Sequence, residues 1–160
     1  MATVALTPDQ DTINVEIQIA APPARVFAAI TDPRQVPQWW GQQGMYRITN
    51  WKNDLRPGGK WRSEGSGGDG KPFHVEGEYL EVDPPRLLVH TWNPSYRELP
   101  ATVVRWELQV HDGGTLVKLS HSGFAGHAEA ARDHSQGWVR VLGWMQAFVE
   151  ENATVETRAA

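Results

Sequence analysis

The segment from about Ala125 to Glu151 constrains the fold of this chain most, because it predicts one long amphipathic helix. Its apolar side chains recur at spacings of three, one, three, three and one, which places them on a single helical face. They are Trp138, Val141, Leu142, Met145, Phe148 and Val149. Such a helix is stable only where its apolar face is covered, so the rest of the chain has to supply a matching apolar surface.

Most of the remaining chain is predicted to form β-strands. Residues 12–20 alternate strictly between apolar and polar side chains, which is the pattern of a half-buried strand. Between residues 44 and 122, turn sequences such as Pro-Gly-Gly at 57–59 and Asp-Gly-Gly at 112–114 separate short runs rich in β-branched and aromatic residues. We predict about six further strands there, joined as hairpins in a meander.

Two short helices are predicted between the first strand and the meander. Pro22 and Pro23 open a stretch to Ile30 whose apolar side chains share a helical face, and proline is tolerated in a first turn. Asp32 is placed to cap a second short helix that ends at the Trp-Trp-Gly of residues 39–41. The economical arrangement is α+β, with the long helix laid across a curved antiparallel sheet of about seven strands, and these two layers can enclose a cavity.

Six short sequences are specific when taken together. They are Ala-Pro-Pro-Ala-Arg-Val-Phe at 21–27, Trp-Trp-Gly at 39–41, Leu-Arg-Pro-Gly-Gly-Lys-Trp at 55–61, Gly-Glu-Tyr-Leu-Glu-Val-Asp-Pro-Pro-Arg-Leu at 77–87, Thr-Trp at 91–92 and Gly-Trp at 137–138. With the order of elements, they resemble the Hsp90 ATPase activator homologue (AHSA1-like) family of the START/SRPBCC superfamily over about residues 12–151. The resemblance implies a helix-grip fold with an internal pocket. It also implies relatives that bind varied apolar ligands, assist partner proteins, or in distant branches act as cyclases and hydroxylase components.

Length and composition limit the organisation and the partners. A chain of 160 residues is the usual size of one domain, and we expect it at 12–151, between an N-terminal tail at 1–11 and a C-terminal tail at 152–160. The formal net charge of −4 leaves no basic surface for a phosphate backbone, so nucleic-acid binding is not expected. No run approaches the ~20 apolar residues of a membrane span. Residues 1–11 also lack the pattern of a secretory signal, so we expect a cytoplasmic protein without a membrane partner.

Neither a metal nor a cofactor is predicted. Cysteine is absent, which excludes disulfides and cysteine-bound zinc. Residues 65–71 match the first seven positions of a phosphate-binding loop, but Pro72 replaces the Mg²⁺-binding Ser or Thr and a strand follows, so a flexible hairpin loop is predicted. His121, His127 and His134 are six and seven residues apart and lack the spacing of a helical metal site.

Tryptophan is the residue type that points to a function. The chain has eight, and each ring can bury on the order of 200 Å² while its N–H still needs a partner. Side chains alternate between the two faces of a strand, and Trp61 and Trp106 fall at positions that face inward; we call this inward parity. Trp138 begins the apolar face of the long helix. Such rings either fill a core or line a pocket, and three of them on converging faces favour a cavity.

Strand register leaves the other candidates open. We expect one of Trp39 and Trp40 at the rim of the pocket mouth and the other on the surface, while Trp92 fits either register. His121 shares the inward parity, and it either points into the cavity or bonds the backbone at a strand end. The residues predicted to contact a ligand are Trp40, Trp61, Trp92, Trp106, His121, Trp138, Leu142 and Met145.

The leading prediction is therefore a protein that binds a small apolar or aromatic molecule between the sheet and the long helix. One alternative, implied by the resemblance, is a module that assists a chaperone or regulator. Another is a cyclase- or hydrolase-type enzyme in which His121 and either Glu76 or Glu78 transfer protons. Both glutamates share the parity of His74, which places them on the cavity side, whereas a strand slip or a bulge at Gly77 turns them to solvent, and we expect the solvent side. No nucleophile motif is present, no catalytic residue is assigned, and a homodimer is left open.

Overall fold

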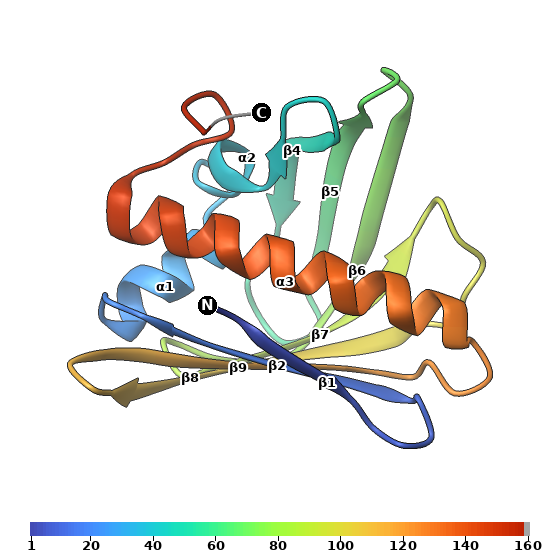
Figure 1. Cartoon of the computed structure of the whole chain (residues 1–160), viewed down its shortest axis with the longest axis horizontal. Helices are drawn as coiled ribbons and strands as arrows, with labels where there is room; N and C mark the ends of the chain where they lie inside the picture. The colour runs from blue at the N-terminus through green and yellow to red at the C-terminus, as the bar shows by residue number, and fades with distance from the viewer. Residues whose placement is uncertain (159–160) are drawn as a thin grey trace.

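The computed structural model describes residues 1–158 and contains one curved antiparallel sheet with a long helix across its concave side (Figure 1). In chain order the elements are β1 (Thr3–Leu6), β2 (Thr12–Ile19), α1 (Pro23–Thr31), α2 (Val36–Trp39), β3 (Gly41–Gln42), β4 (Tyr46–Asn53), β5 (Lys60–Gly67), β6 (Pro72–Asp83), β7 (Leu87–Pro94), β8 (Thr102–His111), β9 (Gly114–Ser122) and α3 (Ala128–Glu151). The predicted α+β helix-grip arrangement is confirmed.

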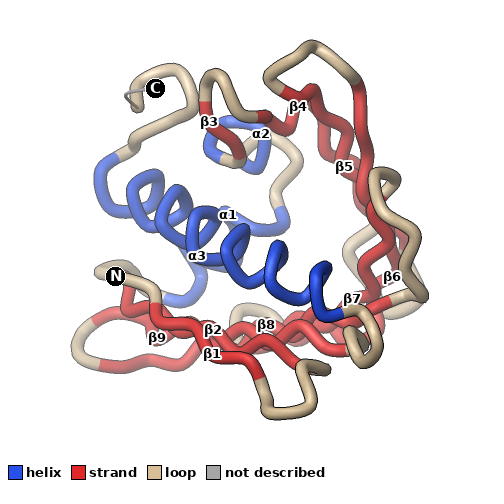
Figure 2. The backbone as a smooth tube through the Cα atoms, turned by 45° about the vertical axis from the view of Figure 1, so that its right-hand side comes forward, coloured by secondary structure: helices blue, strands red, loops and turns tan. Residues whose placement is uncertain are grey.

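The sheet is ordered β1-β2-β9-β8-β7-β6-β5-β4-β3 across the described chain. Figure 2 shows it turning between a flat part made by β1, β2, β9 and β8 and an upright part made by β6, β5 and β4. Helix α3 lies in the angle between the two parts, so the apolar surface that it covers comes from both. No helix within residues 1–158 is long and apolar enough to cross a membrane.

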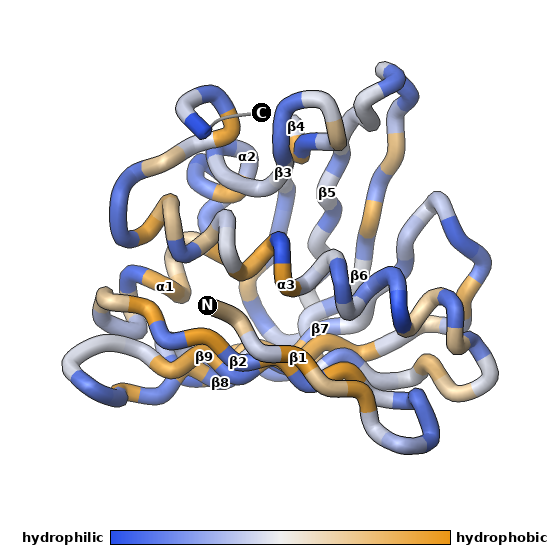
Figure 3. Tube along the Cα trace, in the orientation of Figure 1, coloured by the Kyte–Doolittle hydropathy of each residue, from blue (hydrophilic) through white to orange (hydrophobic). Residues whose placement is uncertain are grey.

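Helix α3 forms where its apolar periodicity predicted it. The face turned to the sheet is buried, and Figure 3 shows apolar and polar positions alternating along the helix with the period of its turns. The helix ends where Asn152 adopts a left-handed conformation with φ of 58° and returns its N–H to the Phe148 carbonyl. Complete burial of a side chain such as Leu142 or Met145 contributes about 1.5–3 kcal/mol to folding.

The turn between β8 and β9 sets the register of the central strands. Asp112 and Gly113 both have positive φ, 50° and 76°, which is the geometry of a two-residue type I′ hairpin. This turn pairs β8 with β9 so that Val104, Trp106 and Leu108 face the helix and are 0–2% exposed. The inward parity predicted for Trp106 is therefore confirmed.

The N-terminal segment is not the free tail that the sequence suggested. Thr3–Leu6 forms β1 and pairs antiparallel with β2, and the two-residue strand Gly41–Gln42 also adds β3 at the opposite edge. Together they raise the predicted seven strands to nine within the described residues. Most of β1 is exposed, and it is held by backbone hydrogen bonds to β2 together with Ala2 and Leu6, which pack against the core. Four residues are too few for an alternating pattern to predict a strand.

The predicted C-terminal tail is also wrong for the residues that the structure describes. Residues 152–158 fold back over α2, and Val155 is buried with only 1% of its surface exposed. The Val155 N–H donates to the Gln38 carbonyl at 2.8 Å. One buried valine has no periodicity, so the sequence alone could not distinguish this segment from a frayed end. Residues 159–160 of the predicted tail lie outside the described part.

The two short helices are confirmed, but Asp32 does not cap the second one. It ends α1, and its carboxylate accepts the backbone N–H of Arg34 at 2.9 Å. The residue before α2 is Gln35, which makes no side-chain cap.

Candidate functional site

A cavity of about 560 Å³ lies between the inner face of β4–β7 and the first half of α3. We call six of its lining side chains the apolar wall: Trp40, Ile48, Trp51, Val75, Trp92 and Trp138. Further apolar and aromatic residues line it nearer the opening and along α3, namely Tyr46, Pro72, Phe73, Tyr96 and Val141. Charged side chains line it too, and we call these four the rim: Lys71, Arg97, Asp133 and Arg140. The volume falls within the range of about 300–1,000 Å³ that small-molecule sites occupy.

A bulge in β4 shapes one side of the cavity. The pairing of β4 with β5 shifts between Ile48 and Asn50, so Ile48 and Trp51 both point inward although they are three residues apart. Without this extra residue, strand alternation would direct Trp51 to solvent. Sequence parity therefore could not identify Trp51 as a wall residue.

The tryptophans form a continuous aromatic cluster behind and along the cavity. Trp40 lies 6.3 Å from Trp51, and Trp51 stacks on Trp61 at 5.1 Å between ring centroids. Trp138 lies 5.4 Å from Trp92 and meets the Trp106 ring edge to face at 5.6 Å. Aromatic pairs at these distances stabilise one another beyond their burial, so the wall is a preformed surface.

Three of these indoles donate their N–H to buried histidines. Trp138 donates to His121 Nδ1 at 3.0 Å, and the other nitrogen of His121 bonds the hydroxyl of Thr102 at 2.7 Å. That hydroxyl donates in turn to the Trp92 carbonyl oxygen, which fits a neutral His121 with its proton on Nε2. The predicted inward position of His121 is correct, and its two nitrogens are used within the protein.

The other two histidines follow the same rule. Trp92 donates to His134 Nε2 at 3.3 Å, and Trp106 donates to His90 Nε2 at 3.2 Å. The Nδ1 of His134 bonds the Ala130 carbonyl at 2.9 Å, and that of His90 bonds its neighbour's carbonyl at 3.0 Å. Each ring thus accepts one indole N–H and donates to one carbonyl, which requires the neutral form.

Burial keeps these three rings neutral. Desolvation lowers the pKa of His90 to about 4. Desolvation also lowers the pKa of His121, with a further lowering from the neighbouring His134 and His90, and it lowers the pKa of His134. Protonation of any of them would place a charge in the core and remove the acceptor of an indole N–H.

The predicted contact residues divide into four groups, and six of the eight residues lie in or next to the cavity. Trp40, Trp92 and Trp138 line the cavity. Trp61 and Trp106 lie deeper, around a void of about 10 Å³, which has room for about one water molecule. His121 is one of the three buried histidines that accept indole N–H groups, and it does not line the cavity.

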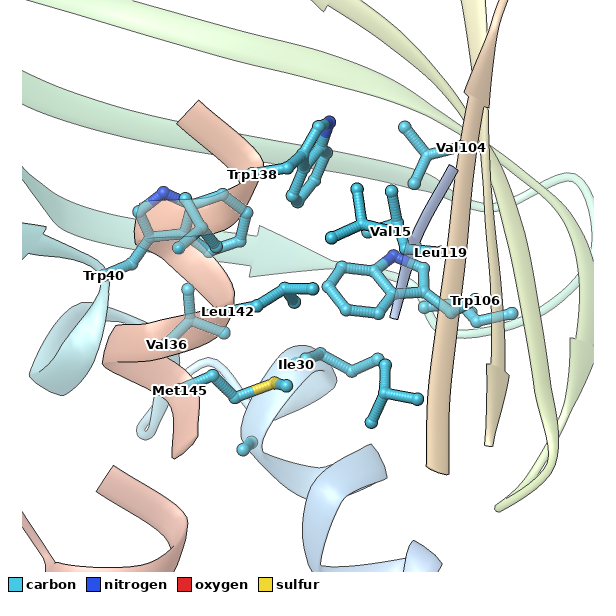
Figure 4. Close-up of a cluster of buried hydrophobic side chains, with 14 of the residues drawn as sticks. Val15, Ile30, Val36, Trp40, Val104, Trp106, Leu119, Trp138, Leu142 and Met145 are labelled. Carbon is cyan, nitrogen blue, oxygen red and sulfur yellow. The ribbon is translucent and has the colours of Figure 1, made fainter. Parts of the chain in front are cut away.

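The remaining two predicted residues belong to the solid core. Leu142 and Met145 lie farther along α3 with Ile30 and Val36, where Figure 4 shows helix α1, helix α2 and the sheet converging. Both are fully buried. The first half of α3 therefore borders the cavity, and the second half closes the core.

Trp39 and Trp40 are both buried, which corrects the expectation that one of them is on the surface. Trp39 is 0% exposed, and its indole donates to the Ala29 carbonyl at 2.9 Å. The guanidinium of Arg158 donates to the carbonyl oxygens of Trp39 and Gly41, on either side of Trp40. The C-terminal segment thus holds the link that places Trp40 in the cavity, a tertiary contact that parity cannot indicate.

Sequence reasoning missed the rim and His134. His134 precedes Trp138 by one helical turn, so the helical spacing places it on the same face as Trp138 and could have identified it. Lys71, Arg97 and Arg140 come from three separate elements, and only the tertiary fold brings them to one cavity.

The glutamates considered for proton transfer lie on the outer face of the sheet. Glu78 pairs with Lys60 at 2.6 Å, and Glu76 pairs with Arg62 at 3.2 Å. They face outward because β6 alternates with Val75 inward, and its bulge lies after Tyr79 and not at Gly77. The expected solvent exposure is therefore correct, although the bulge is elsewhere.

The sequence that matches a phosphate-binding loop forms the hairpin between β5 and β6, as predicted. Within the described residues, no three His, Asp or Glu side chains are grouped to hold a metal ion.

Comparison with known proteins identifies one family. The model of the family described as Activator of Hsp90 ATPase homolog 1-like protein matches residues 20–150. No curated protein matches the sequence.

Several solved structures are similar over nearly their whole length. Protein Ms6760 from Mycobacterium smegmatis is 25% identical with a TM-score of 0.81, and the match covers 94% of this chain and 98% of that one. Protein CV1439 from Chromobacterium violaceum is 26% identical with a TM-score of 0.76, covering 88% and 97%. An AHSA1-like protein from Aeromonas hydrophila is 22% identical with a TM-score of 0.73, covering 88% and 93%, and supports the fold alone. These matches agree with the fold predicted from the sequence.

Proposed function

The chain belongs to the family of Activator of Hsp90 ATPase homolog 1-like proteins, and from this starting point we propose that it binds a small aromatic or apolar molecule in the cavity beneath α3. The observation that carries the proposal is the chemistry of the apolar wall. Trp92 and Trp138 have already given their N–H groups to His134 and His121. What they offer a ligand is therefore ring faces and C–H edges, which favour an aromatic or aliphatic body.

A neutral fluorescent probe tests this proposal directly. N-phenyl-1-naphthylamine carries no charge at neutral pH, and its binding is followed by its own emission and by quenching of the tryptophans. We expect saturable binding at one site per chain, with energy transfer from the tryptophans that line the cavity.

Two glycines of α3 supply a blocking variant and its matched control. Gly137 lines the cavity, and an added Cβ there meets open space, so Gly137→Leu fills the cavity without a backbone clash. Gly143 lies on the exposed side of the same helix and is equally open, so Gly143→Leu makes the same chemical change away from the cavity. Both replacements remove a helical glycine, which favours helix stability by up to about 1 kcal/mol.

We expect Gly137→Leu to weaken probe binding at least about tenfold, because a loss of roughly 1.4 kcal/mol corresponds to that factor. Gly143→Leu should bind the probe as the natural chain does. An unsaturable probe signal, or equal binding by both variants, would contradict the proposal.

The two other functions considered from the sequence have less support. Assistance to a chaperone or regulator remains a prediction from the family resemblance, which affinity co-purification of the full chain tests. A proton-transfer enzyme would need another base, because Glu76 and Glu78 lie on the far face from the cavity.

A further inference from the structure

We propose that the molecule bound in the cavity is an amphipathic anion, with an aromatic or apolar body against the apolar wall and a carboxylate or similar acid at the rim. This inference rests on the proposed function and deepens it by naming the charge of the ligand. It is carried by the distribution of charge around the cavity.

Three cations and one anion line the cavity. Lys71 comes from the hairpin before β6, Arg97 from the loop after β7 and Arg140 from α3. Lys71 and Arg140 line the cavity and are also exposed, so they lie where the cavity meets solvent. Asp133 is the single carboxylate among the described lining residues.

Pairing at the rim leaves two of the cations available. Arg97 and Asp133 form an ion pair at 2.5 Å, which neutralises both. Neither Lys71 nor Arg140 takes part in an ion pair within residues 1–158. The rim therefore carries a surplus of two positive charges, in a chain whose formal net charge is −4. A local field opposite to that of the whole protein favours an anion at this opening.

Among the described lining residues, the interior of the cavity offers such a charge no cation. Its neutral donors are few: the buried indole N–H of Trp51, which has no partner within the described residues, and the hydroxyls of Tyr46 and Tyr96, which also line the cavity. The Ser63 hydroxyl donates to the Val75 carbonyl, and both ring nitrogens of His134 are bonded within the protein. An acid group buried against the apolar wall would exchange its hydration for neutral donors alone, which do not balance a buried charge. At the rim it keeps contact with water and gains the guanidinium of Arg140, which can bind a carboxylate through two N–H groups.

A matched pair of probes separates this inference from the proposed function. 4-(1-Pyrenyl)butyrate and 4-(1-pyrenyl)butanol share the same aromatic body, and only the first is an anion. Binding of each to the full chain is measured by quenching of tryptophan emission at low and at high salt. The natural chain should bind the butyrate about fivefold more tightly at low salt, as expected for two solvent-exposed charge interactions.

Two variants assign the preference to the rim. Arg140→Gln should remove most of the preference, measured as the ratio of the butyrate and butanol affinities, so that any change in cavity shape that affects both probes cancels. Arg132→Gln, at an exposed cation of α3 that does not line the cavity, should keep the preference. High salt should reduce the preference in the natural chain, because exposed charges are screened.

The outcomes distinguish the two proposals. Equal affinity for both probes, or a preference that Arg140→Gln leaves intact, overturns the anionic ligand while the cavity remains a binding site. Failure of both pyrene probes and of the neutral naphthylamine overturns the proposed function and this inference together.

Discussion

The buried histidines make acid sensitivity the most quantitative consequence of this structure. His90 accepts the indole N–H of Trp106 as a neutral ring, and desolvation lowers its pKa to about 4. In the unfolded chain the same side chain titrates at its ordinary value of 6.5. Below pH 6.5 the unfolded state binds a proton at His90 that the folded state does not bind until about pH 4. The free energy of unfolding therefore falls as the pH falls.

The size and window of this loss follow from the two pKa values. The contribution of His90 is intact above about pH 6.5, decreases down to about pH 4, and changes no further below it, where both states are protonated. Between pH 6.5 and 4.5 the loss is about 2 kcal/mol, at roughly 1.4 kcal/mol per unit of pKa difference. His121 and His134, with lowered pKa values, lose stability in the same direction.

Urea unfolding of His90→Gln and of the natural chain at both pH values isolates this term. Glutamine offers a carbonyl oxygen to Trp106 but does not titrate, so the variant should lose about 2 kcal/mol less than the natural chain on acidification. Val110→Ala is the control, because this side chain is 79% exposed and does not titrate, so the variant should keep the pH dependence of the natural chain.

Identical pH dependence of the natural chain and His90→Gln would refute the reasoning. It would mean that His90 takes up its proton equally in the folded and unfolded states, and that its burial does not govern acid stability.

Two further substitutions test the packing. Gly77→Ala should lower the free energy of unfolding by about 3 kcal/mol. The reason is that a Cβ there would lie 2.2 Å from the Thr91 carbonyl oxygen and 2.7 Å from the Trp61 indole nitrogen. An unchanged urea midpoint would contradict this close approach of β6 to its neighbouring strands. Val155→Ala should lower the free energy of unfolding by about 2 kcal/mol, because this buried side chain packs the C-terminal segment on α2. Val110→Ala, at a side chain that is 79% exposed, should leave it almost unchanged. Thermal unfolding of both variants measures the difference.

Periodicity along single elements determined the fold class. The helix face from Trp138 to Phe148 and the alternation of residues 12–20 are local patterns, and each element buries the side that its own sequence makes apolar. The turn at Asp112 and Gly113 is equally local, since positive φ at both positions depends on those two residues. The inward positions of Trp61 and Trp106 followed from the same rule.

The tertiary structure decided the rest of the site beyond the predicted tryptophans Trp40, Trp92 and Trp138. A bulge after Ile48 turned Trp51 inward, and contacts with Arg158 fixed the link that carries Trp40. The meeting of Lys71 and Arg140 at one opening depends on how α3 crosses the sheet. The periodicity of a single element predicts which of its sides is buried. It does not predict which other segments pack against that side, because those contacts join residues far apart in the chain.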